Sequence, residues 1–223
     1  MEMLPVISTP WSEAWVAWTM LGILVLGAIA HDMQPQAIGM AFRSLFTIGD
    51  RSSMFIDTNL DRRAEIIMII LSICTFSMGA YTSVVAYLGS GVYSFQTYGF
   101  IVLISLGIML VRAILEMIAA YTFVPQSKVH TLYYHYYHLT VCTALIHFPI
   151  VLLCLFWGAL TPQAIILLNV AVIAFYLFTV LIKSCLLLMR SLKGFIYILI
   201  TVITLELIPF VAAIGCSYLL INN

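Results

Sequence analysis

Four ionisable side chains interrupt long apolar stretches of this 223-residue chain, and they are its first candidates for chemistry. They are Arg112, Glu116, Lys183 and Glu206, two of each charge. Charged groups are costly inside a bilayer, so they normally face the interior of a helix bundle, where they pair or line a path. Arg112 and Glu116 are spaced i, i+4, so they share one helix face and can form an ion pair.

A second partner for Arg112 follows from its depth. At 1.5 Å per residue, Arg112 and Glu206 lie roughly 16 and 18 Å from the same side of the membrane. We therefore expect Arg112 to contact Glu206, Glu116 or both. Lys183 lies closer to the end of its span, where its long side chain can reach the membrane surface.

Uncharged polar residues recur at helical spacing on the same spans and predict a polar seam inside the bundle. They are Ser105, Tyr136, Thr140, Thr143, His147, Asn169 and Tyr176. One interpretation is a hydrogen-bonded network that fixes helix packing. The others are a path for protons, ions or a substrate, and a groove that accepts the transmembrane helix of another protein.

The histidines suggest haem or metal binding only weakly. Haem held by two histidines normally needs them on facing helices at matched depth, and only His31 lies outside the segment that contains His135 and His138. The tyrosines around that segment are typical of the aromatic belt at a membrane boundary. None of the five cysteines forms a Cys-x-x-Cys pair. We therefore expect no metal site and no cofactor, with His31, His135 and His138 as the weak candidates.

Catalytic motifs are missing from the sequence. It has no His-Glu-x-x-His zinc motif and no glycine-rich phosphate loop. The segment Gly89-Ser90-Gly91 resembles a serine nucleophile only superficially, because no histidine is expected at its depth. We therefore expect a protein that is not an enzyme.

Composition identifies the environment that must position these residues. Hydrophobic residues make up 64% of the chain and charged residues 8%, whereas soluble domains carry about 25% charged residues. Nine Lys and Arg balance nine Asp and Glu, so no basic surface exists for nucleic acid. The sequence predicts an all-α, polytopic membrane protein whose immediate partner is the lipid bilayer.

Six stretches reach the roughly 20 apolar residues that a membrane-spanning helix needs. They are residues 12–31, 64–88, 98–123, 131–157, 162–189 and 194–220, and together they form a single helical membrane domain, 1–223. The loop 32–63 contains apolar residues at helical spacing between Pro35 and Ile48. This pattern predicts a short amphipathic helix at the membrane interface. It is either a connector that folds back onto the spans or a docking surface for a partner.

The distribution of positive charge predicts orientation. Seven residues, Arg43, Arg51, Arg62, Arg63, Lys128, Arg190 and Lys193, lie in alternate connections, and the remaining connections and both termini carry no Lys or Arg. Short loops rich in Lys and Arg stay in the cytoplasm. We therefore expect a cytoplasmic loop 32–63 and both termini on the outer side of the membrane.

The C-terminal segment carries a family resemblance. An aromatic-rich helix from Gly194 runs into Thr204-Leu205-Glu206-x-x-Pro209. This ending is similar to that of a Bacteroidota inner-membrane family, domain of unknown function 4271. The resemblance implies an envelope protein of Gram-negative Bacteroidota and no particular activity. In the inner membrane of such a bacterium, the outward-facing termini would lie in the periplasm.

The function that we expect is non-catalytic. The chain would be an inner-membrane subunit or assembly factor that works with other inner-membrane or envelope proteins in secretion or membrane-protein insertion. The alternative is a small transporter or proton-conducting unit that uses Arg112, Glu116 and Glu206. A haem or metal membrane protein is a third possibility.

Overall fold

The computed structural model describes residues 13–46, 62–89, 94–188 and 196–198, and every regular element within them is a helix. The helices are α1 (Ala14–Met33), α2 (Pro35–Phe46), α3 (Arg62–Leu88), α4 (Phe95–Phe123), α5 (Gln126–Phe156) and α6 (Pro162–Leu188). Five of them, α1 and α3 to α6, are long and apolar enough to cross a membrane. The chain is therefore a multi-pass, all-α protein. Apart from 196–198, the span expected at 194–220 lies outside the described residues, and so does Glu206.

Some helices extend beyond the apolar stretches that predicted them, because local capping residues determine where a helix begins and ends. α4 begins at Phe95 because Ser94 caps it, with the Ser94 hydroxyl accepting from the Thr97 amide at 3.1 Å. α5 begins at Gln126, five residues before the expected start, directly after Pro125. α3 is followed by Gly89, which adopts the positive φ of 82° that favours glycine after a helix. The spans predicted from sequence begin later than α4 and α5 do, because the polar residues of a first turn lower the local hydropathy but still form a helix.

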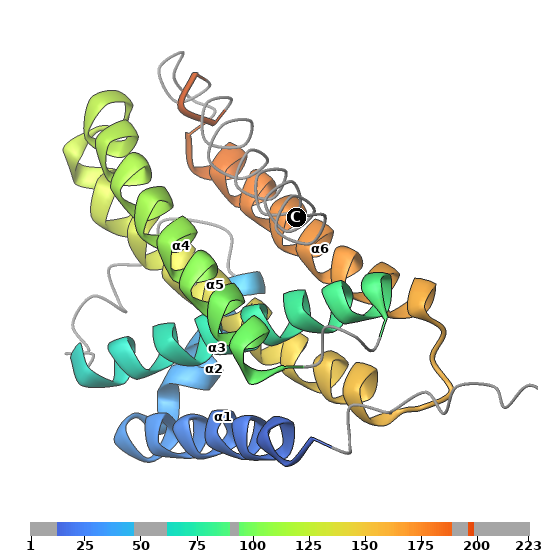
Figure 1. The fold of residues 1–223 in the computed structure, drawn as a ribbon. Coiled ribbons are helices and arrows are strands. Elements are labelled where there is room, and N and C mark those ends of the chain that lie inside the picture. The colour runs from blue at the N-terminus through green and yellow to red at the C-terminus, as the bar shows by residue number, and fades with distance from the viewer. Residues whose placement is uncertain (1–12, 47–61, 90–93, 189–195, 199–223) are drawn as a thin grey trace, which may run out of the picture.

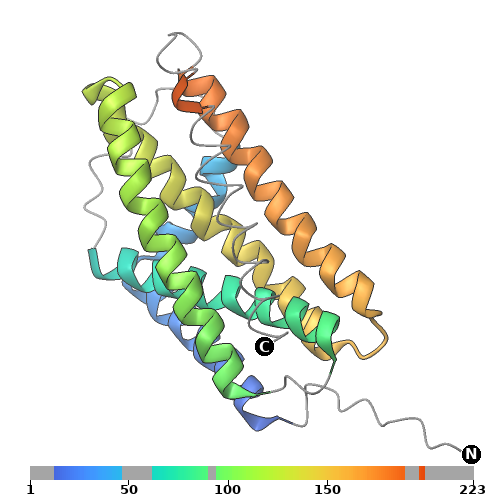
Figure 2. The same ribbon diagram turned by 45° about the horizontal axis from the view of Figure 1, so that its top comes forward.

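α3 is the central helix of the described bundle. It contacts α1, α4, α5 and α6 and crosses α4, α5 and α6 at a steep angle in both views (Figures 1 and 2). Serine and threonine hydroxyls along α3 donate to main-chain carbonyls one turn earlier, as Thr75 does to Leu71 at 2.8 Å. Such bonds satisfy the hydroxyl without water, so a polar helix can lie at the centre of an apolar bundle.

α2 folds back onto the membrane-spanning helices. It contacts α1 and α5, and Ala41 at its centre is buried with Ala30 of α1 and Cys142 of α5. Of its described apolar side chains, Ala41 and Ile38 therefore pack against the bundle, as the connector interpretation expects. The side chain of Phe42, one turn after Ile38, is exposed.

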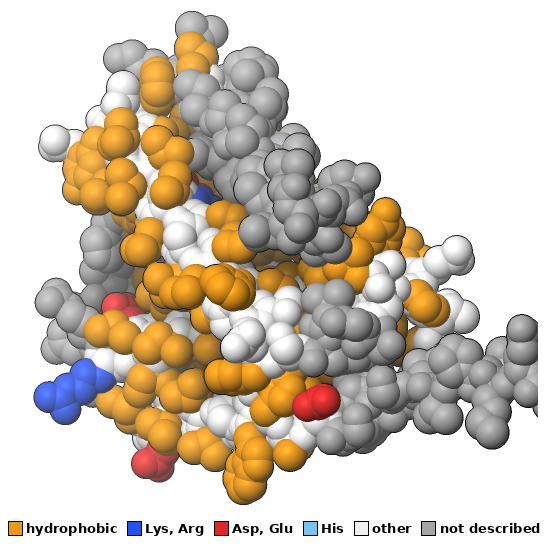
Figure 3. Space-filling model, viewed as in Figure 1, with side chains coloured by type: hydrophobic (Ala, Val, Ile, Leu, Met, Phe, Trp, Pro, Cys, Tyr) orange, Lys and Arg blue, Asp and Glu red, His pale blue; other side chains and the backbone are white. Residues whose placement is uncertain are grey.

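The outer surface is apolar, as a bilayer requires. Figure 3 shows hydrophobic side chains over most of the described part of one face, with few charged groups among them. α4 has the most exposed surface of the five long helices. Large side chains such as Leu103, Leu110 and Ile118 lie more than half exposed along it. Exposed apolar area of this extent fits lipid as the surrounding solvent.

Candidate functional site

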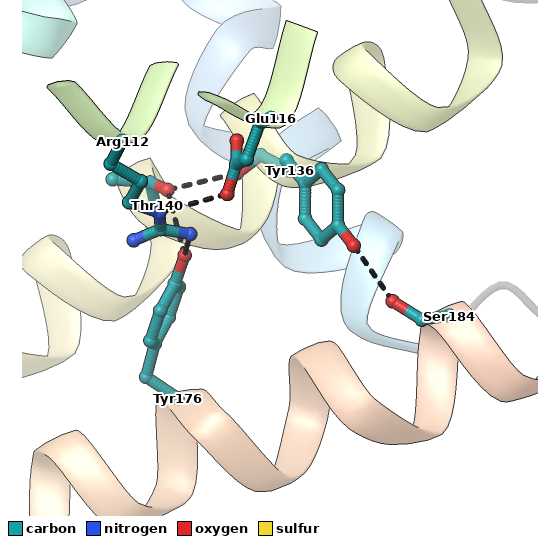
Figure 4. A network of polar contacts seen from close by, with 6 residues as sticks. All are labelled: Arg112, Glu116, Tyr136, Thr140, Tyr176 and Ser184. Atoms are coloured by element: carbon teal, nitrogen blue, oxygen red, sulfur yellow. Dashed lines mark hydrogen bonds and ion pairs between the residues drawn. The ribbon is translucent and has the colours of Figure 1, made fainter. Parts of the chain in front are cut away.

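The charged pair on α4 lies at the centre of a polar network with α5 and α6 (Figure 4). Arg112 Nε donates to Glu116 Oε1 at 2.8 Å, and both side chains are largely buried. Arg112 also donates through Nη2 to the hydroxyl of Tyr176 on α6, and its guanidinium carbon lies 5.3 Å from the centre of the Tyr176 ring. The expected contact of Arg112 with Glu206 concerns a residue outside the described part of the chain.

The hydrogen bonds in this network run in one direction. The Tyr176 hydroxyl, which accepts from Arg112, lies 3.5 Å from Thr140 Oγ1 on α5. Thr140 in turn donates to the main-chain carbonyl of Tyr136 at 2.9 Å, so Tyr176 is the donor to Thr140. Arg112 thus donates to Tyr176, Tyr176 to Thr140, and Thr140 to a main-chain carbonyl. The carbonyl accepts a hydrogen bond and has no proton to pass on.

A second contact joins α5 and α6 about two turns after Tyr176, nearer the C-terminal end of α6. The hydroxyls of Tyr136 and Ser184 lie 2.8 Å apart, and both side chains are buried. Tyr136 belongs to a core cluster that also contains Tyr176 and Tyr197. This contact fixes the axial register of α5 against α6.

A separate network surrounds Asn169, which lies nearer the N-terminal end of α6. At 1.5 Å per residue, Asn169 is about 10 Å from Tyr176 along the helix. His147 Nε2 and Asn169 Oδ1 lie 2.8 Å apart. Asn169 Nδ2 donates to Thr82 Oγ1 on α3 at 3.2 Å and to the carbonyl of Ile165 at 3.0 Å. Because the Asn169 amide nitrogen is a donor, its oxygen must accept, and His147 carries its hydrogen on Nε2. Thr82 donates to the carbonyl of Gly79 at 2.8 Å, so this network also ends at the main chain.

Gly79 makes the approach of α3 to His147 possible. A Cβ atom at position 79 would lie 2.2 Å from His147 Cε1, 2.6 Å from His147 Nε2 and 3.0 Å from Asn169 Oδ1. The imidazole is almost fully buried and held by a hydrogen bond, so it cannot easily move aside. The glycine is therefore required by the close packing of three helices.

The structure brings most of the expected polar seam together and separates some of its members. Arg112, Glu116, Tyr136, Thr140 and Tyr176 form one network, and His147 and Asn169 belong to the other. Thr143 is buried on α5 and donates to the carbonyl of Leu139. Ser105 is half-buried on α4, two turns from Arg112, and takes part in neither network. Within the described part of the chain, the polar residues therefore form two separate groups.

The histidines proposed as weak metal candidates occupy different environments. His31 is exposed at the end of α1, and His138 is buried, with its Nδ1 2.8 Å from the carbonyl of Tyr134. His135 and Lys183 are half-buried on α5 and α6. Among the described residues, no three His, Cys, Asp or Glu side chains lie close enough to share a metal ion.

Sequence reasoning missed three residues that complete the networks: Thr82, Ser184 and Gly79. The available signal was the recurrence of small and hydroxyl-bearing residues between positions 72 and 83 of α3. Such residues allow close helix approach and hydrogen bonding across helices in membranes. The predicted seam included no residue of α3, although this helix has its own row of polar side chains.

Comparison with known proteins identifies a family for this chain but does not indicate an activity. A family model described as Domain of unknown function (DUF4271) matches residues 16–216, which is most of the chain. No curated protein and no solved structure matches the chain.

Proposed function

This chain belongs to the DUF4271 family, and from that premise we propose that it is a non-catalytic membrane subunit or assembly factor. The supporting observation is the form of the two polar networks. Each joins three helices and, among the described residues, ends at a main-chain carbonyl. Buried polar groups arranged in this way hold a particular helix packing rather than carry out a reaction.

The setting that we propose is a cell-envelope complex in the inner membrane of a Bacteroidota bacterium, in secretion or membrane-protein insertion. Six spans, with the sixth at 194–220, and both termini in the periplasm complete the proposed topology. It rests on the positive charge of alternate connections, which include Arg62 and Arg63 at the start of α3. The other envelope proteins of the complex are its proposed partners.

Co-purification tests the proposed function. The full chain, carrying an affinity tag and expressed at native abundance, should retain one or more membrane proteins at constant stoichiometry in mild detergent. The matched control is an unrelated six-span protein with the same tag and abundance, which should not retain them. A chain that purifies alone, in a single monodisperse species, from cells in which it is functional would contradict the proposal.

Labelling of single cysteines tests the proposed topology. In a background in which the five native cysteines are replaced, a cysteine at Asn223 should react with an impermeant maleimide added to intact spheroplasts. A cysteine at Asp50 in the loop 32–63 should react only after the membrane is opened. The reverse pattern would show that the charge-based orientation is wrong.

A proton-conducting unit is the second candidate function, because the polar residues extend far along one helix pair. From Asn169 to Ser184, α6 contributes polar side chains over about 22 Å at 1.5 Å per residue, and the buried pair Arg112–Glu116 lies beside this stretch. Reconstituted chain with a pH-sensitive dye inside the vesicles would show proton flux in this case. A chain that folds but lacks both charges of the pair would lose that flux.

A further inference from the structure

We draw no further inference here: the strongest candidate, the exposed apolar face of α4 that includes Leu103, Leu110 and Ile118, carries nothing because nothing in the described part of the chain shows what, besides lipid, covers it.

Discussion

We expect Glu116→Gln to lower the thermal stability of the chain in detergent substantially, because it removes one partner of a buried ion pair. Glu116 is 7% exposed, and its carboxylate lies 2.8 Å from the guanidinium of Arg112. Glutamine keeps the size of the side chain and removes the charge that compensates Arg112. Removing one partner of a buried ion pair costs about 3–5 kcal/mol in soluble proteins, and membrane proteins show smaller values. Loss of monodisperse protein on heating, followed by size-exclusion chromatography, measures the effect.

The double variant Arg112→Met/Glu116→Gln should recover much of the stability, because it leaves neither charge in the bundle. Glu13→Gln is the matched control, since Glu13 precedes α1 and makes no side-chain capping bond. It should change stability little. If Glu116→Gln is as stable as wild type, the pair is not the structural element that its geometry indicates.

The same double variant separates the two candidate functions. A membrane subunit whose pair is structural should keep its partners once the fold recovers. A proton-conducting unit should show flux in the wild type, and the double variant should fold and remain inactive. Flux through the wild type that is lost in the folded double variant would establish the second function in place of the first.

Gly79→Ala should have the second largest effect, through packing alone. The added methyl group would lie 2.2 Å from His147 Cε1, well inside van der Waals contact. Either α3 shifts or the imidazole moves and loses its 2.8 Å contact with Asn169. Overpacking a core costs about 1–3 kcal/mol, and the lost hydrogen bond adds about 1 kcal/mol. The measurement is the same thermal assay.

Gly107 offers the matched control for this substitution. It lies on the exposed face of α4, and a methyl group added there would have no neighbouring atom within 4 Å. Gly107→Ala should leave stability unchanged or raise it, because alanine favours the helix by about 0.5–1 kcal/mol. His147→Ala on the Gly79→Ala background should recover part of the loss, since it removes the colliding ring. A stable Gly79→Ala single variant would show that α3 does not approach His147 so closely.

The sequence by itself determined the class of protein and the neighbours along each helix. Composition requires a membrane, because a chain with 8% charged residues cannot cover a soluble surface. The Arg112–Glu116 pair follows from helix geometry alone, since residues four apart share a face. The short helix predicted between Pro35 and Ile48 likewise follows from a repeat within one segment, and α2 spans Pro35–Phe46. These are local properties, and each depends only on residues close in sequence.

The tertiary structure decided which helices share their polar groups. Nothing in the spacing of Asn169 and Tyr176 tells that one bonds to His147 and Thr82 while the other accepts from Arg112. These partnerships depend on the steep crossing of α3 over α5 and α6 (Figure 1) and on the closeness that Gly79 allows. A crossing angle results from the packing of whole helix surfaces. Residues 22 or 87 positions apart, as in the contacts of Asn169, meet only once that packing exists.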